Sequence, residues 1–338
     1  MSSIREVGEV RGNRAASAFA AFWIVSVLLA IGLVALYVWA ADGGFPLDDS
    51  WIHQVYARNL AQSGEWSFVP GQPSGGSTSP LYTALLALGY ALGVPYAAWT
   101  HGLGVLALAA AGVIGFAMAW RLAAGWRWVA VAAGLAVLLA WHLVWAAASG
   151  METMLFATWT LVLVWLAWRE FDAIDTGRAV WRGALYGLVA ALTVMTRPEG
   201  AMLAGLGGLA VVGLRPHGLR AAVAWGGGAA LAFVVGIAPY LALNLHLTGG
   251  LLPNTSAAKQ AQHAPLLALP FARRFADMLL PVVSFCCCPV WSPSPLMCCG
   301  ARAANRRRWP VCCRCCGRWD CWRCTRRGCR RLTSMGAT

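Results

Sequence analysis

Two adjacent carboxylates, Asp48 and Asp49, stand directly after the first long apolar run of the chain. Neighbouring negative charges repel each other, and beside a membrane they cannot both shed their water cheaply. Such a pair is typical of acid–base chemistry or of a cation site, although a solvated loop also accommodates it. The surrounding polar segment, residues 42–80, is therefore the first place to look for a functional site.

Three further polar segments occur at the ends of apolar runs. The first holds Glu152, the second holds Arg197 and Glu199 around a proline, and the third holds Asn254, with Lys259 five residues later. Glu152 starts an apolar helix, where an anion is favoured, so helix capping and lining of a site are both open. Arg197 and Glu199 form either a local ion pair or a substrate contact.

Metal binding is a separate question for the first segment. His53 follows Asp49 by four residues, a spacing that places two side chains on one helical face. One histidine and one or two aspartates make an incomplete ligand set, so a hydrogen-bonded interfacial histidine is the favoured interpretation of His53. Asp49 remains the candidate ligand of a divalent cation.

These segments are positioned by an unusually apolar chain. Hydrophobic residues make up 59% of the 338 residues and charged residues 12%, against about 25% in soluble domains, and the mean hydropathy is +0.61. We therefore predict an all-α, polytopic membrane protein built as a helical bundle. Runs long enough to cross the bilayer cover 19–41, 97–120, 128–148, 151–168 and 221–243. A shorter pair, 183–196 and 201–214, is predicted to form a helical hairpin, which gives about seven helices before residue 285.

The arginines predict an orientation. With a cytoplasmic amino terminus, the basic residues of the inner loops outnumber those of the outer loops, as the positive-inside rule requires. The outer side then receives Arg58, Arg197 and Lys259 before the carboxyl region, and it also receives all four polar segments. The ten inner residues are Arg5, Arg11, Arg14, Arg121, Arg127, Arg169, Arg178, Arg182, Arg215 and Arg220.

A short helix is predicted in the first outer loop. Residues 50–62 carry Ile52, Val55, Tyr56 and Leu60 at helical spacing, with polar residues elsewhere on the wheel. That pattern predicts an amphipathic helix lying on the membrane surface. The apolar stretch 80–94 is short for a span, and its placement stays open between an interfacial and a re-entrant piece.

The carboxyl-terminal segment 286–338 differs abruptly from residues 1–285. It holds all 12 cysteines and 11 of the 26 basic residues. Zinc binding and contact with nucleic acid or anionic lipid compete with a genetic origin, in which leucine codons read in a shifted frame become cysteine codons. The frameshift interpretation is favoured, so we expect a disordered tail, no nucleic-acid partner, and a membrane domain that is truncated and that ends near residue 285.

The ordered set of motifs resembles the GT-C class of membrane glycosyltransferases that use polyprenyl-phosphate sugars. Leu47-Asp48-Asp49, Gly150-Met151-Glu152-Thr153, Arg197-Pro198-Glu199-Gly200 and Leu252-Pro253-Asn254-Thr255 carry the likeness, which is similar to arabinofuranosyltransferase-like members. The resemblance implies a bacterial plasma-membrane enzyme that transfers a sugar from a polyprenyl-phosphate donor to a glycan or lipid acceptor outside the cytoplasm.

The resemblance also implies residue roles. It places Asp48 and Asp49 at the catalytic acidic motif, with Asp48 as general base and Asp49 assisting it or holding the cation. Arg58, Arg197 and Lys259 are candidates for the donor phosphate, which suits the bidentate fork of arginine. Glu152, Glu199 and Asn254 are predicted to contact substrate. A transporter or flippase for a lipid-linked or anionic solute, and an assembly subunit, are the alternatives.

Overall fold

Long apolar helices dominate the computed structural model, which describes residues 2–123, 126–173, 176–214, 218–251, 264–277 and 279. The chain divides into Met1–Ala264 and Pro265–Thr338, and each unit is considered by itself. Only residues 265–277 and 279 of the second unit are described, so the predicted boundary at residue 285 and the cysteine-rich tail lie outside this part.

In the described part of the first unit, five helices are long and apolar enough to cross a membrane, as predicted for a polytopic helical bundle. The predicted span at 128–148 is instead two helices bent by 51° at Ala140, where neither proline nor glycine occurs. The helix over 183–196 begins earlier than predicted and is itself long enough to span. The five helices are α1 Ser2–Ala40, of which Ser17–Ala40 is the apolar part, α4 Tyr96–Leu122, α7 Thr153–Phe171, α8 Ala179–Thr196 and α10 Leu219–Thr248.

The remaining elements are shorter. One apolar helix of 12 residues, α3 Pro80–Ala91, lies in the stretch 80–94, whose placement the sequence left open. Another of 15 residues, α9 Gly200–Leu214, corresponds to the second half of the predicted hairpin. The bent pair is α5 and α6, and a two-stranded antiparallel ribbon follows α2. The bounds are α2 Asp49–Ser63, β1 Ser67–Val69, β2 Gln72–Pro73, α3 Pro80–Ala91, α5 Arg127–Leu139, α6 Trp141–Ala148, η1 Thr176–Arg178, α9 Gly200–Leu214 and α12 Ala264–Leu267.

Two packing seams hold the first unit together. Phe22 of α1 stacks on Phe116 of α4 with ring centroids 4.4 Å apart, within a core that α5 and α6 also line. Helices α8 and α10 approach so closely that a Cβ atom on Gly187 would lie 2.0 Å from the Ala229 carbonyl oxygen. Small residues at such a crossing let two helix backbones meet, which is a common way to pack helices where lipid offers no hydrophobic driving force.

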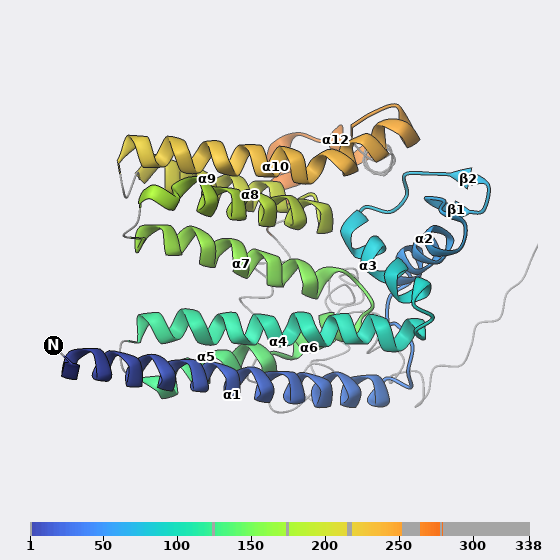
Figure 1. Cartoon of the computed structure of the whole chain (residues 1–338). Helices are drawn as coiled ribbons and strands as arrows, with labels where there is room; N and C mark the ends of the chain where they lie inside the picture. The colour runs from blue at the N-terminus through green and yellow to red at the C-terminus, as the bar shows by residue number, and fades with distance from the viewer. Residues whose placement is uncertain are drawn as a thin grey trace, which may run out of the picture. The chain divides into compact units, whose positions relative to one another are not determined.

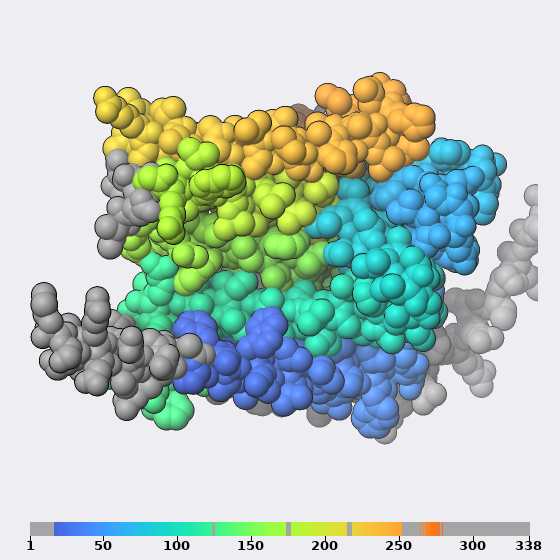
Figure 2. Space-filling model, in the orientation of Figure 1, coloured from blue at the N-terminus to red at the C-terminus, as the bar shows by residue number. Residues whose placement is uncertain are grey.

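The connections place the polar segments at one end of the bundle (Figure 1). Helices α1, α8 and α10 finish at the end where α4, α7 and α9 start, and α2, α3 and the ribbon lie there too. We call this the polar end. In the space-filling view, α2 and the ribbon form its projecting part (Figure 2). The orientation of the polar end relative to a membrane remains a prediction.

Candidate functional site

Three of the four predicted motif segments meet at the polar end. The Ser50 hydroxyl of α2 donates a hydrogen bond of 2.7 Å to the Ser149 carbonyl oxygen, just before α7. His53 Nε2 lies 3.2 Å from Glu152 Oε2, and Arg197 Nη1 lies 3.5 Å from Glu152 Oε1. The structure therefore brings the segments that carry the aspartate pair, Glu152 and Arg197 together.

Helix α2 buries polar as well as apolar side chains against the bundle. The buried residues are Ser50, His53, Gln54, Tyr56, Ala57 and Asn59, whereas Ile52, Val55 and Leu60 are half-buried. The predicted helix is confirmed, and its position on a membrane surface remains a prediction. The polar side chains can be buried because their neighbours present hydroxyl, carboxylate and carbonyl groups, which satisfy them.

Polar contacts fix α2 to its neighbours. Gln54 donates to the Thr100 hydroxyl of α4 at 2.8 Å and accepts a hydrogen bond of 2.9 Å from the Tyr90 hydroxyl of α3. Asn59 donates to the Ser67 carbonyl oxygen of β1 at 2.9 Å. Because each of these buried groups has a partner, the first turns of α2 are held in one position.

His53 occupies the centre of this packed region. Its Nδ1 atom lies 3.3 Å from the Ser77 hydroxyl and 3.4 Å from the Thr83 hydroxyl, and these hydroxyls are 2.8 Å apart. The Tyr82 ring meets the imidazole edge-on with centroids 5.7 Å apart. These contacts match the hydrogen-bonded interpretation of His53. The sequence does not indicate Ser77 and Thr83 as its partners, because nothing in their spacing links them to α2.

Glu152 is a buried carboxylate between the imidazole of His53 and the guanidinium of Arg197. It precedes α7 and is 5% exposed. Its Oε2 atom faces His53 without the alignment of a hydrogen bond, so that contact is electrostatic. Burial raises the pKa of Glu152, but His53 and then the Arg197 guanidinium lower it more, and the resulting pKa lies below the ordinary value of 4.5.

Arg197 stands at the rim of the site. It ends α8 in an extended conformation, as expected of a residue that precedes a proline. Its side chain is 36% exposed, contacts both Glu152 and Glu199, and lies 5.8 Å from the centre of the Phe156 ring. The predicted local pair with Glu199 is present at 3.4 Å. Because a guanidinium has five N–H donors, an exposed one can also bind a ligand.

Asp48 and Asp49 lie at the solvent-facing start of α2. Both are exposed, Asp48 caps the helix without a side-chain hydrogen bond, and Asp49 is its first residue. Arg58 is also exposed, but nine residues after Asp49, which is about 14 Å along a helix axis. One phosphate cannot contact Arg58 and remain beside the aspartates. Of the predicted phosphate ligands that the structure describes, Arg197 is therefore the remaining candidate.

Two other predicted ligands, Asn254 and Lys259, lie outside the described residues. Among the residues that the structure does describe, no three His, Cys, Asp or Glu side chains are grouped so that they could hold a metal ion. These side chains alone do not complete a cation site, so the role of Asp49 as a metal ligand remains a prediction.

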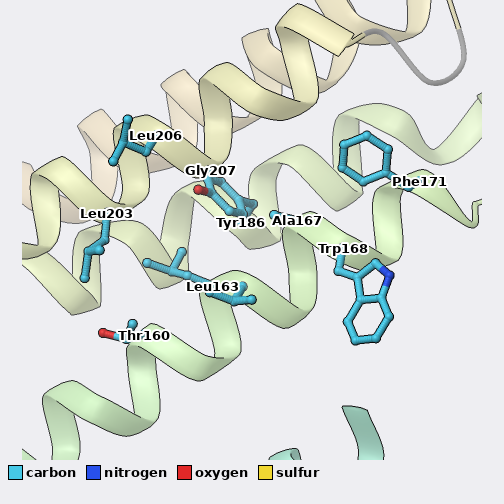
Figure 3. A pocket seen from close by; sticks show the side chains of 10 residues that line it. Thr160, Leu163, Ala167, Trp168, Phe171, Tyr186, Leu203, Leu206 and Gly207 are labelled. Carbon is cyan, nitrogen blue, oxygen red and sulfur yellow. The ribbon is translucent and has the colours of Figure 1, made fainter. Parts of the chain in front are cut away.

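A separate apolar groove of about 450 Å³ lies between α7, α8 and α9 (Figure 3). Thr160, Leu163 and Trp168 line one side of it, and Leu203 and Leu206 line another. Thr160 follows Glu152 by eight residues, about 12 Å along α7, so the groove is distinct from the polar end. It offers no charged side chain for chemistry.

Comparisons of the chain with family models, with curated proteins and with solved structures find no match. Any function proposed for the chain therefore rests on the residues and the geometry of the polar end.

Proposed function

We propose that this chain is a membrane glycosyltransferase that moves a sugar from a polyprenyl-phosphate donor to a glycan or lipid acceptor outside the cytoplasm. The observation that carries the proposal is that the helix with the exposed carboxylate pair is linked, at one end of an apolar bundle, to Arg197 through His53 and the buried Glu152. A lipid-linked donor would reach such a site from the bilayer, with its phosphate at the polar end.

The proposed reaction assigns a different task to each group. Asp48 accepts the proton of an acceptor hydroxyl while the hydroxyl oxygen forms a bond to the anomeric carbon. The bond between that carbon and the donor phosphate oxygen breaks, and the phosphate leaves with the bonding electrons. Arg197 stabilises the charge that develops on the phosphate. Asp49 assists Asp48 or holds a divalent cation there.

Transfer is favoured over transport by the positions of the buried charges. In the described part of the chain, the buried carboxylates are Glu152 and Glu170, at the two ends of α7. Glu170 forms two 2.8 Å hydrogen bonds with Arg182 of α8. A transporter is expected to place charged groups near the middle of the membrane between broken helices. Charges at helix ends suit chemistry at the membrane surface instead.

Sugar transfer by the reconstituted chain tests the proposal. The measurement uses polyprenyl-phosphate sugars in proteoliposomes, with Asp48→Asn compared with Asp42→Asn. Asp42 is an exposed carboxylate in the same connection, and its φ of 56° is readily adopted by asparagine, so it is a matched control. Asp48→Asn should lower the turnover at least about 100-fold, the scale of a general base, while Asp42→Asn should leave it unchanged. Equal turnover in the two variants removes the catalytic role of Asp48.

A further inference from the structure

We infer that Glu152 is a positioning residue: it holds the Arg197 guanidinium at the rim of the site and does not itself contact substrate. The link to a phosphate ligand rests on the proposed function, whereas the hold on Arg197 rests on the structure alone. Three separate elements create this arrangement, namely α2 through His53, α7 through Glu152 and α8 through Arg197.

Both carboxylate oxygens of Glu152 are engaged. Oε2 faces His53 at 3.2 Å and Oε1 faces Arg197 at 3.5 Å, and the side chain is only 6% exposed. Because so little of the side chain is exposed, a ligand outside the protein has little access to either oxygen. The Ser50 hydrogen bond to the Ser149 carbonyl oxygen further ties the turn before Glu152 to α2.

Glu199 provides an internal comparison, because it contacts the same guanidinium at nearly the same distance. Its side chain is 63% exposed, against 6% for Glu152. Exposed ion pairs contribute little, since water screens them and the side chains lose freedom. Arg197 is itself 36% exposed, but water screens the buried carboxylate of Glu152 less than the exposed carboxylate of Glu199. The hold on Arg197 should therefore come from Glu152.

Positioning has a direct consequence for ligand binding. An arginine side chain left to itself samples many rotamers, and binding then has to offset the loss of that freedom. Glu152 supplies this order in advance, and an anion that binds Arg197 competes with the exposed Glu199 for the Nε and Nη2 donors. The ligand chemistry that fits is a phosphate monoester or diester, which a planar guanidinium recognises with two hydrogen bonds.

The test compares Glu152→Gln with Glu199→Gln in the full chain in lipid nanodiscs. Phenylglyoxal modification of Arg197, followed by peptide mass spectrometry, reports the freedom of its guanidinium without any assay of activity. We expect the modification rate to rise severalfold in Glu152→Gln and to stay near the wild-type rate in Glu199→Gln. Glu152→Asp, which keeps the charge, should restore most of the protection. Equal rates in the two glutamine variants overturn the inference.

Binding of undecaprenyl phosphate, measured on the same nanodiscs, separates the inference from the proposed function. If both hold, Glu152→Gln weakens binding about tenfold, the change that 1.4 kcal/mol makes in a dissociation constant, and Glu152→Asp restores most of the binding. A wild-type chain that protects Arg197 but binds no undecaprenyl phosphate supports the positioning and contradicts the donor. If Glu152→Gln does not elute as a folded species, the modification rates of Arg197 in Glu152→Asp and Glu199→Gln are compared instead. Faster modification in Glu199→Gln than in Glu152→Asp then overturns the inference.

Discussion

Replacing Gly228 by alanine tests whether α8 and α10 pack backbone against backbone. A Cβ atom at Gly228 would lie 2.3 Å from the Val180 carbonyl oxygen, and at least 3.0 Å is needed, so the helices would have to separate by about 0.7 Å. The seam matters for the site because α8 ends at Arg197, so its displacement moves the arginine.

The expected cost combines two opposing effects. Overpacking of this kind costs about 1–3 kcal/mol, and the higher helix propensity of alanine returns up to about 1 kcal/mol. A net loss of about 1–2 kcal/mol corresponds to a fall of roughly 1.5–3 °C in the midpoint of thermal unfolding for a chain of this size. Gly227, the preceding residue, is the matched control, because a Cβ atom placed there would have no other atom within 4 Å.

Intrinsic fluorescence during heating, in detergent or nanodiscs, measures the two variants against the wild type. Gly228→Ala should unfold at a lower temperature, and Gly227→Ala at the wild-type temperature or slightly above it. Destabilisation of both variants to the same extent would show that the glycines matter for local helix geometry and not for the seam. An unchanged Gly228→Ala would refute the close packing itself.

Two further predictions concern topology and pH. The topology test uses a chain whose 12 cysteines are replaced by serine. In intact cells, Ser63→Cys should react with a membrane-impermeant thiol reagent and Trp126→Cys should not. The reverse result would invert the orientation predicted from the arginines. Because the pKa of Glu152 is lower in the folded chain than its ordinary value of 4.5, its contribution to stability should be complete above that value and lost as the pH falls through the lower folded pKa. The difference in unfolding temperature between wild type and Glu152→Gln should therefore be present at pH 7 and shrink below about pH 4.5, and a difference that is constant with pH would contradict this.

The long helices could be predicted because their apolar length is a local property. Span prediction needs only a run of apolar residues, and the observed α4, α7 and α10 differ from the predicted runs by a few residues at each end. The bend at Ala140 could not be predicted, since no residue that usually breaks a helix occurs there. The early start of α8 differs from the prediction because Arg182, expected in a loop, lies in the helix and pairs with Glu170 of α7.

The candidate site was predictable in its location but not in its interior. Charge counting predicts that the segments of Asp48, Glu152 and Arg197 share one side, and these segments do meet at the polar end. The contact between His53 and Glu152 could not be predicted, because it depends on which face of α2 is buried. Apolar periodicity does not indicate which polar residues of α2 are buried, since partners from distant parts of the chain decide it. The spacing of Ser50, His53 and Gln54 was the available signal.

A structure of the full chain with a bound polyprenyl-phosphate sugar, determined by electron cryo-microscopy with an antibody fragment to add mass, tests the central claim most directly. We predict the phosphate in contact with Arg197 at the polar end, with the anomeric carbon facing the start of α2, where Asp48 lies. Glu152 should remain buried between His53 and Arg197 and make no contact with the donor. A phosphate bound beside Arg58, or at the opposite end of the bundle near Arg121, would contradict the proposed reaction.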